Sequence, residues 1–314
     1  MIIDFSSHII TSEVETALSA GKNFNRLKKN FAPDSSDPEK RMRLMDKYGI
    51  DMQVLTQTTP VLAGLDRAAA TDICRITNDA VGKICRAYPD RFVPFAVVTL
   101  LDVEGAVLEL ERAVKKWGCR GVTIGTNHDN QGLDDPANAP FYEKLGELDI
   151  PVFLHPMHWR SYPLVEEDQA VMRLFGWPFD TTIAILRLVM SGTMERYPTL
   201  KVVSHHLGGG MLPFFSNRFK VKLPNLKSAL KKPVSDSFER IYADTAVDGT
   251  AAALPCGHAF FGTKRMLFGT DYPFSPENGE VYLRENLEII RNWDLPEQDK
   301  AEILGGNARR LLKL

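Results

Sequence analysis

Short apolar runs of strand type alternate with longer segments of helical periodicity along most of the chain. The predicted strands span residues 2–5, 52–56, 91–98, 120–124, 151–155, 201–205, 238–243 and 265–269. The predicted helices span residues 38–48, 67–88, 103–117, 137–148, 179–196, 211–218, 247–260, 279–291, 297–304 and 306–313. Regular alternation of strand and helix is typical of a parallel sheet covered by helices, so the pattern predicts an α/β fold.

Eight strand–helix units in a chain of 314 residues predict a closed (β/α)₈ barrel, or TIM barrel. The competing α/β fold is a doubly wound open sheet. That fold would carry a Gly-x-Gly-x-x-Gly turn after its first strand, and the chain has none there. No stretch has the composition of a linker, and we expect one barrel domain over residues 1–314, with insertions.

Composition narrows the possible partners and the compartment. Hydrophobic residues make up 44% and charged residues 25% of the chain, and the net charge of −2 gives no reason to expect nucleic acid or a membrane surface as a partner. The four cysteines form no Cys-x-x-Cys pair, which favours reduced, buried thiols in a cytoplasmic protein. Neither a signal peptide nor an apolar run of about 20 residues is present, so we expect no membrane span.

Imidazole and carboxylate groups stand at the carboxyl ends of four predicted strands. The chain places His8, His155, the adjacent pair His205 and His206, and Asp271 there. Each of them alone has an ordinary structural explanation, such as a buried histidine or an Asx turn. Because parallel-barrel enzymes place their chemistry at this end, the shared position favours one cavity that holds a divalent metal such as Zn²⁺, Mn²⁺ or Fe²⁺.

Strand geometry sets the expected orientation of these side chains. Alternation along a strand puts Asp4, Ser6 and His8 on one face of the first strand. By the same rule, only one histidine of the pair after residue 204 can face the cavity, and the sequence pattern alone leaves open which one.

Seven segments in a fixed order carry a family resemblance: Arg41–Leu55, Tyr88–Val93, Arg120–Thr126, Phe153–Pro156, Pro178–Ala184, Tyr197–Val203 and Leu267–Phe274. Each segment alone is weak, but in this order the chain resembles the amidohydrolase superfamily over essentially its whole length. The resemblance is specifically to the decarboxylase branch with aminocarboxymuconate-semialdehyde decarboxylase and γ-resorcylate decarboxylase. It implies a metal-dependent hydrolase-like TIM barrel.

The resemblance also implies residue roles. His8, His155 and Asp271 match metal ligands of the family, and Ser6 stands where the family has a further His or Glu ligand. A serine hydroxyl is a poor ligand for these metals, so a site built on three protein ligands is expected, with Zn²⁺ as the metal and Mn²⁺ as the alternative. His206 rather than His205 matches the histidine that serves as acid or base, with His205 facing outward; Asp271 is its catalytic partner.

Arginine, histidine and tryptophan residues are the candidates for holding a substrate. Arg41 and Arg43 lie where the family has a carboxylate-binding arginine, and His158 and Trp177 lie in the long segment after the fifth strand. The resemblance therefore implies non-oxidative decarboxylation of a small aromatic or enol-type carboxylic acid by a homodimer. Two alternatives stay open: a metal-dependent hydrolase of a lactone, ester, amide or carbon–carbon bond, and a relative that has lost its metal together with the ligand at Ser6.

Overall fold

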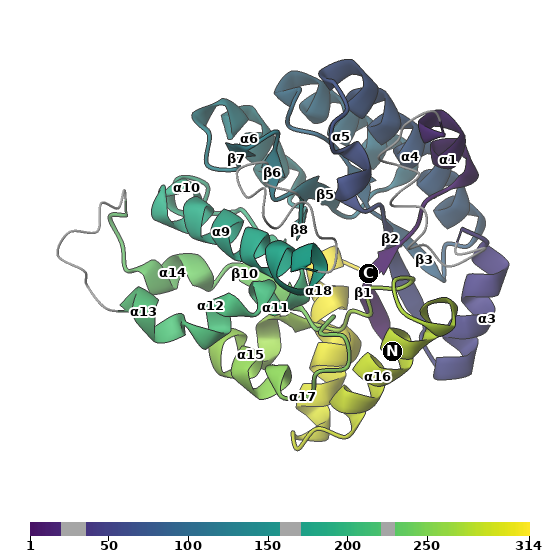
Figure 1. The fold of residues 1–314 in the computed structure, drawn as a ribbon, viewed down its shortest axis with the longest axis vertical. Helices are drawn as coiled ribbons and strands as arrows, with labels where there is room; N and C mark the ends of the chain where they lie inside the picture. Colours follow the sequence, from purple (N-terminus) through teal and green to yellow (C-terminus); the bar gives the residue numbers. More distant parts are fainter. Residues whose placement is uncertain (20–35, 158–170, 221–229) are drawn as a thin grey trace.

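A ring of short parallel strands forms the centre of the computed structural model, which describes residues 1–19, 36–157, 171–220 and 230–314 (Figure 1). The strands are β1 Ile3–His8, β2 Met52–Thr56, β3 Phe92–Pro94, β4 Ala96–Val97, β5 Val122–Gly125, β8 Val152–His155, β9 Val202–Ser204, β10 Ile241–Asp244 and β11 Met266–Leu267. A small antiparallel hairpin, β6 Asn127–His128 and β7 Gln131–Gly132, follows β5. The strands correspond one by one to the predicted strands, with β3 and β4 sharing one of them.

The strands close into a barrel through two irregular junctions. Regular pairing gives one sheet in the order β1-β2-β3 and another in the order β11-β10-β9-β8-β5-β4, all parallel. Phe95 alone separates β3 from β4, which joins the two sheets on one side. On the other side, the amide of Phe5 donates to the carbonyl of Phe268 at 2.8 Å and the amide of His8 to that of Tyr272 at 2.7 Å. The predicted TIM barrel is therefore confirmed.

Helices surround the strands in Figure 1 and follow the predicted pattern. They are α1 Ser12–Leu18, α3 Pro38–Tyr48, α4 Arg67–Ala87, α5 Val103–Trp117, α6 Ala139–Leu148, α9 Trp177–Met190, α10 Thr193–Arg196, α11 His206–Gly209, α12 Met211–Phe214, α13 Ser216–Lys220, α14 Val234–Phe238, α15 Ala253–Phe261, α16 Glu280–Arg291, α17 Glu297–Ala301 and α18 Asn307–Leu312. Local sequence sets their ends. In α3, Asp37 accepts hydrogen bonds from the first-turn amides, and Gly49 ends the helix at φ 72°.

One predicted strand begins later than expected. The prediction placed a strand at 238–243, but α14 continues to Phe238 and β10 begins at Ile241. This shift matters because Asp244 becomes the last residue of a strand, at the end of the barrel where the other polar groups lie. None of the helices in the described part of the chain combines the length and apolar character needed to cross a membrane.

A β-bulge in β1 changes which side chains face the barrel interior. Asp4 pairs with Gln53 and Ser7 with Leu55, so β1 carries one more residue than β2 over this stretch. Phe5 packs inside against two other rings, and Ser6 also contacts an interior residue, so two consecutive side chains point inward. The prediction that Asp4 shares a face with Ser6 and His8 is therefore wrong, because it assumed strict alternation.

Aromatic and aliphatic side chains fill the barrel below the polar end. Phe5 packs edge to face on Phe95 and Phe153, with ring centroids 5.4 and 5.8 Å apart. Leu311 and Leu312 of α18 belong to the same buried cluster, so the last helix closes the amino-terminal end of the barrel. Apolar packing thus fills the barrel from its amino-terminal end, and in barrel enzymes generally the carboxyl-terminal end carries the active site.

Arg41 of α3 is built into the wall of the barrel and does not point into its cavity. Its side chain is buried, Nη1 donates to Ser7 Oγ at 2.5 Å, and Nη2 donates to the carbonyl of His8 at 2.6 Å. The guanidinium also stacks over the Tyr272 ring, 4.5 Å from its centroid. This placement contradicts the prediction that Arg41 binds a substrate carboxylate. Arg43 is exposed on the same helix and is not among the residues that line the cavity described below.

Asp4 joins β1 to the segment after β11. Its Oδ2 accepts hydrogen bonds from Thr270 Oγ1 at 2.7 Å and Gln53 Nε2 at 2.9 Å, and its Oδ1 accepts one from the amide of Thr270 at 3.1 Å. Burial raises the pKa of the Asp4 carboxyl to about 7, and the hydrogen bonds from Thr270 and Gln53 oppose that rise. Asp4 is therefore a titrating group within the seam of the barrel.

We expect Asp4→Asn to remove a pH dependence of stability. An acid whose folded pKa is raised stabilises the fold at low pH, and that contribution falls as pH rises from its unfolded value near 4 to about 7. The unfolding free energy of the variant, minus that of the wild type, should therefore increase between pH 5 and pH 7 and level off above. Urea unfolding across this range measures it, and a difference that stays constant with pH would contradict the assignment.

Candidate metal centre

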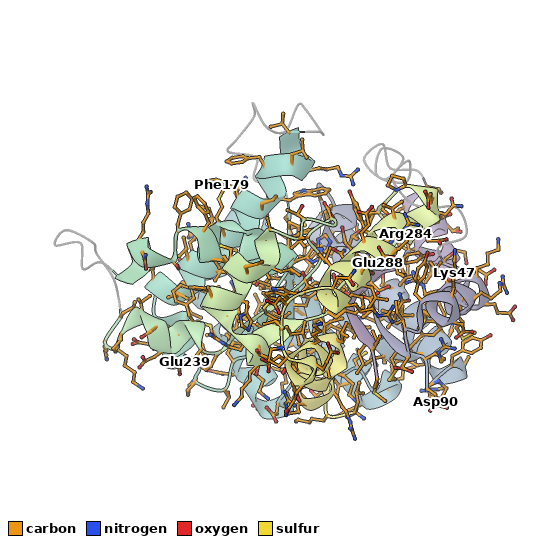
Figure 2. All side chains as sticks on the ribbon, turned by 90° about the horizontal axis from the view of Figure 1, so that it is seen from below. Lys47, Asp90, Phe179, Glu239, Arg284 and Glu288 are labelled. Carbon is orange, nitrogen blue, oxygen red and sulfur yellow. The ribbon has the colours of Figure 1, made fainter. Side chains whose placement is uncertain are left out.

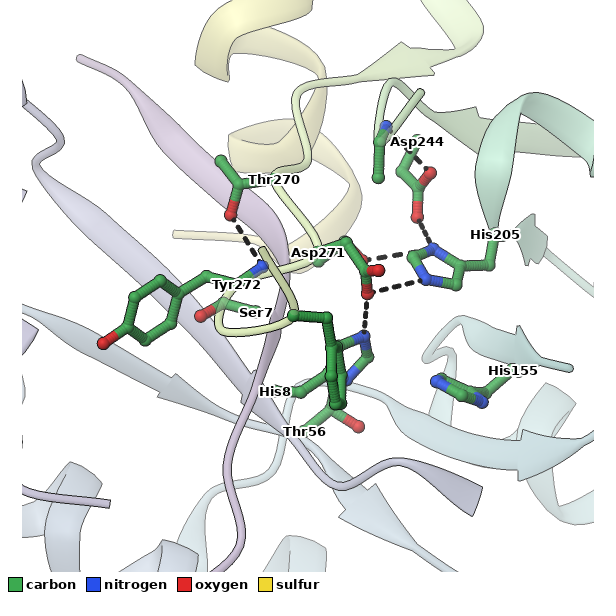
Figure 3. Close-up of polar contacts among 12 residues, drawn as sticks. Ser7, His8, Thr56, His155, His205, Asp244, Thr270, Asp271 and Tyr272 are labelled. Carbon is green, nitrogen blue, oxygen red and sulfur yellow. Dashed lines mark hydrogen bonds and ion pairs between the residues drawn. The ribbon is translucent and has the colours of Figure 1, made fainter. Parts of the chain in front are cut away.

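The carboxyl ends of the strands bring four imidazoles and a carboxylate into one cluster, hereafter the metal centre. His8 ends β1, His155 ends β8, His205 and His206 follow β9, and Asp271 follows β11. Figure 3 shows the Asp271 carboxylate in contact with the rings of His8 and His205, with His155 below His205 and to the right of His8 in this view. His8, His155, His205 and Asp271 are buried, and the side chain of His206 is 20% exposed.

Asp271 is the common neighbour of three of these imidazoles. Its Oδ1 lies 3.0 Å from His8 Nε2 and 3.2 Å from His205 Nε2, and its Oδ2 lies 3.7 Å from His206 Nε2. The amide of Asp271 donates to the carbonyl of Ser6 at 2.9 Å, which fixes the backbone of this segment against β1. The position of the carboxylate thus depends directly on the closing seam of the barrel.

His155 presents a single ring nitrogen to the centre. Its Nδ1 lies 3.2 Å from Thr59 Oγ1 and 3.0 Å from the carbonyl oxygen of Pro156. A backbone carbonyl can only accept, so this contact favours the proton on Nδ1 and leaves the lone pair on Nε2. The ring centroid of His155 lies 4.9 Å from that of His8 and 5.4 Å from that of His205.

The adjacent histidines both reach the centre, contrary to the prediction that His205 faces outward. His205 is fully buried and contacts Asp271, and its ring centroid lies 3.6 Å from that of His206. The physical reason is that His205 is still extended after β9, with φ −74° and ψ 153°, whereas the backbone leaves the extended conformation at His206. His206 has φ 52° and Leu207 φ 55°, which belong to the left-handed region, and strand alternation no longer applies.

Asp244, which the sequence analysis did not single out, holds both histidines in place. Its Oδ2 accepts a short hydrogen bond from His205 Nδ1, and its Oδ1 accepts from the amide of His206 at 2.9 Å. The amide of Ala246 also donates to Oδ1, at 3.2 Å. A buried carboxylate with these three donors fixes the left-handed turn. The available signal was an acidic residue directly after an apolar run, as at Asp271.

Burial and neighbouring charge shift the pKa values of the cluster in opposite directions. Burial lowers the pKa of His8, and burial together with the nearby His8 and His205 rings lowers that of His155 well below the ordinary value. Burial also disfavours a charged His205, but Asp244 and Asp271 outweigh it and raise the pKa of His205 to about 10. The cluster therefore combines neutral imidazoles with one imidazole, His205, that holds its proton strongly.

Asp271 is held as a carboxylate. Burial alone would raise its pKa, but the imidazoles of His205, His206 and His8 beside it outweigh burial and hold the pKa of Asp271 well below the ordinary value. An ionised oxygen donor facing neutral imidazole nitrogens is the donor set that first-row divalent metals prefer.

The arrangement fits a divalent metal ion. One ligand atom each from His8, His155 and His205 lies within 4.8 Å of the others, and so do ligand atoms of His205, His206 and Asp271. Neither ring nitrogen of His8 makes a hydrogen bond within the described structure, although both are buried. Buried polar atoms normally have partners, so the buried Nε2 of His8, which lies 3.0 Å from Asp271 Oδ1, fits the place of a metal ligand.

Removal of the metal should lower the thermal stability. We expect EDTA-treated protein to unfold at a lower temperature, and Mn²⁺ or Zn²⁺ to restore the wild-type value, because a ligand bound only by the folded state stabilises it. At a free concentration 100 times the dissociation constant, the gain is about 2.7 kcal/mol. Differential scanning fluorimetry with Mg²⁺ as the control ion measures this. Identical melting temperatures with and without chelator would point to a chain that has lost its metal.

A cavity opens above the metal centre, and its volume is about 480 Å³ when the open solvent at its mouth is included. Its polar side is formed by His155, His205, His206 and Asp271, and its apolar side includes Pro60, Trp177 and Phe274. Trp177 thus lies where the sequence analysis expected a substrate contact. His158, the other candidate from this segment, lies outside the described residues.

Arg173, which the sequence analysis did not consider, lines the same cavity. It belongs to a π-helical turn, Met172–Gly176, that leads directly into α9, and its Nη2 donates to the carbonyl of Phe274 at 3.4 Å. Arg173 rather than Arg41 or Arg43 brings a permanent positive charge to this cavity within the described part of the chain.

Several known proteins that this chain resembles in sequence are decarboxylases. The chain is 31% identical over 297 residues to γ-resorcylate decarboxylase of Rhizobium radiobacter, an alignment that covers 87% of this chain and 86% of that protein. It is 30% identical over 289 residues to 2-amino-3-carboxymuconate-6-semialdehyde decarboxylase of Dictyostelium discoideum, covering 88% and 77% of the two chains.

Solved structures agree with this relationship. A dihydroxybenzoic acid decarboxylase from Polaromonas sp., solved with bound manganese and the inhibitor 2-nitroresorcinol, superposes with a TM-score of 0.82. It is 28% identical, and the match covers 100% of this chain and 97% of that one. The profile of the Amidohydrolase family matches residues 3–314, and the chain therefore belongs to that family.

Proposed function

We propose that this protein is a metal-dependent decarboxylase that removes carbon dioxide from a small hydroxylated aromatic carboxylic acid, without oxidation. The observation that carries the proposal is that His155, His205 and Asp271 line one partly apolar cavity and that His8 lies directly behind them, 3.0 Å from Asp271. An aromatic acid suits this cavity because polar groups form one side of it and the flat apolar side chains of Trp177 and Phe274 form the other. The decarboxylases among the relatives support the same reaction.

The polar side and the apolar side of the cavity contribute to this reaction in different ways. A divalent metal held by His8, His155, His205 and Asp271 would supply a Lewis acid for the oxygen atoms of the substrate. Trp177 and Phe274 provide flat apolar surfaces for the ring. Arg173 provides a cation for a second anionic or phenolic oxygen on the ring. In this orientation the carboxylate-bearing carbon of the substrate faces the polar side of the cavity.

His206 and Asp271 are the groups positioned to move a proton. His206 Nε2 lies 3.7 Å from Asp271 Oδ2, and His206 is the imidazole of the centre that keeps contact with the cavity solvent. Proton delivery from this pair to the carboxylate-bearing carbon forms a new C–H bond. The carbon–carbon bond to the carboxylate then breaks, its electron pair restores the aromatic ring, and carbon dioxide leaves.

The metal proposed for this centre is manganese or zinc. Manganese is supported by the related structure from Polaromonas sp., and zinc by the predominance of imidazole among the nearby donors. Reconstitution with each metal in turn, followed by activity measurement, distinguishes the two.

A carbon dioxide release assay tests the proposal. Metal-free protein is reconstituted with Mn²⁺ or Zn²⁺ and supplied with 2,6-dihydroxybenzoate, other hydroxylated benzoates and muconate-like acids. We expect metal-dependent release of carbon dioxide, and none from benzoate, because benzoate lacks the neighbouring oxygen. If metal-loaded protein releases no carbon dioxide across the panel but hydrolyses lactones or esters, the hydrolase alternative replaces this proposal.

We further propose that the protein acts in the cytoplasm as a homodimer. The four cysteines are free thiols, and three of them are buried, which suits a reducing compartment. Leu174, Phe175 and Phe214 are large apolar side chains with at least half of their surface exposed, which a second copy could cover. Analytical ultracentrifugation tests the dimer.

A further inference from the structure

Ser6 occupies the position where the family resemblance leads one to expect a metal ligand on β1. The side chain is fully buried, and its Oγ lies 3.2 Å from His205 Nδ1. A neutral hydroxyl donates poorly to a divalent metal. The short side chain of Ser6 packs directly against the imidazole of His205. A longer side chain at this position of β1 would reach the metal centre. His205 lies beside that position.

His205 has the orientation of a metal ligand. Asp244 accepts a hydrogen bond from Nδ1, which directs the other nitrogen, Nε2, to a point 3.2 Å from Asp271 Oδ1. Ligand atoms about 2.1 Å from one metal lie roughly 3.0–3.4 Å from each other, and this spacing matches that geometry. Metal-bound histidines usually donate their second ring N–H to a carboxylate or a carbonyl, and Asp244 supplies that carboxylate.

The imidazoles of His8 and His155 approach the same point from other sides. His8 Nε2 approaches the same oxygen, Asp271 Oδ1, at 3.0 Å, and the ring centroids of His8 and His155 lie 5.5 and 5.4 Å from that of His205. His155 has its Nδ1 occupied by Thr59 and the Pro156 carbonyl, so its Nε2 is the free nitrogen. His8, His155 and His205 therefore surround one point next to Asp271.

We propose that His205 is the fourth protein ligand of the metal and replaces the β1 ligand that Ser6 does not provide. Asp244 is its positioning residue, which holds Nδ1 protonated and Nε2 aimed at the metal. The inference rests on the proposed metal-dependent function. The two adjacent histidines then have different roles. His205 is a metal ligand, whereas His206, whose Nε2 lies 3.7 Å from Asp271 Oδ2, is not.

Metal affinity tests this assignment without any substrate. Metal-free wild type, His205→Ala, Asp244→Asn and His206→Ala are titrated with Mn²⁺ and Zn²⁺ against a competing chelator, and bound metal is counted by mass spectrometry. We expect Asp244→Asn to weaken binding about 10- to 100-fold, as loss of a supporting carboxylate does. His205→Ala should weaken it further. His206→Ala is the matched control, because it removes the adjacent imidazole, and it should keep an affinity close to that of the wild type.

The coordination number of imidazole provides a second readout. X-ray absorption of the zinc-loaded protein should show three imidazole ligands in the wild type and in His206→Ala, and two in His205→Ala. Because loss of His205 leaves Asp244 without its partner, His205→Gln is prepared as well; its side chain can still donate to Asp244. Circular dichroism of each variant establishes that it is folded.

A rescue variant separates a ligand from a merely structural residue. Adding Ser6→Glu to His205→Ala returns a ligand to β1, and we expect it to recover most of the lost metal affinity. Wild-type affinity and three imidazoles in folded His205→Ala would overturn the proposal, as would folded wild type that binds no metal. Metal binding that follows the expected pattern, with no release of carbon dioxide from any acid, would leave this ligand set intact and refute the decarboxylase.

Discussion

Replacing Asp271 with asparagine is expected to reduce the decarboxylation rate by about 10² to 10⁴-fold, the range that a positioned proton-transfer group contributes. The carboxylate of Asp271 approaches His8 and His205 through Oδ1 and His206 through Oδ2. An amide keeps the size of the side chain but removes the negative charge. The variant therefore loses an anionic metal ligand and the proton partner of His206 in one step.

The rate is measured as carbon dioxide release at saturating metal, so that weaker metal binding does not hide the effect on the chemical step. Asp90→Asn serves as the control, because Asp90 is an exposed residue at the edge of the molecule in Figure 2. It should retain the wild-type rate. An Asp271→Asn enzyme that stays within threefold of the wild-type rate would remove Asp271 from the mechanism.

Replacing Arg41 with alanine should destabilise the fold by about 3 kcal/mol or more, the usual cost of removing one member of a buried charged network. The side chain is only 1% exposed and donates to Ser7 Oγ and to the carbonyl of His8. Its Nη1 also donates to Gln53 Oε1 at 3.1 Å. Alanine would leave these acceptors and a large cavity behind.

The control lies two residues away on the same helix. Arg43 is exposed on α3, and Arg43→Ala should change the unfolding free energy by no more than about 0.5 kcal/mol. Chemical unfolding followed by circular dichroism compares the two variants. We also expect Arg41→Ala to lose activity, because Arg41 holds the backbone of His8 and stacks on Tyr272, the neighbour of Asp271. Equal stabilities of the two variants would contradict the structural role of Arg41.

The barrel and three groups of its centre were predictable because they follow from local rules. Strand and helix periodicity gave the alternation, and His8, His155 and Asp271 were found because each one follows a strand. The prediction of a metal-dependent decarboxylase rests on the family resemblance, because the periodicity of hydrophobic residues does not indicate which reaction a barrel catalyses. Trp177 was named as a substrate residue, and the structure places it beside the cavity, but its contact with substrate stays a prediction.

The features that escaped prediction depend on backbone geometry that residue types alone do not determine. The bulge in β1 inserts one residue without any glycine to mark it, so Asp4 was assigned to the wrong face. A left-handed histidine is rare, and the inward position of both His205 and His206 therefore contradicted a sound rule. The substrate role of Arg41 is implied by the family resemblance alone, and residue type does not show that this arginine is buried in the barrel wall.

The seam between β1 and the segment after β11 also decides when this protein can become active during its synthesis. Asp4 and Thr270 meet across 266 residues of sequence, and His8 meets Asp271 over the same junction. Until the last strand leaves the ribosome, β1 has one unpaired edge that can pair with other chains. Metal loading is thus a late event, and a chain truncated before residue 271 carries the histidines without the carboxylate that unites them.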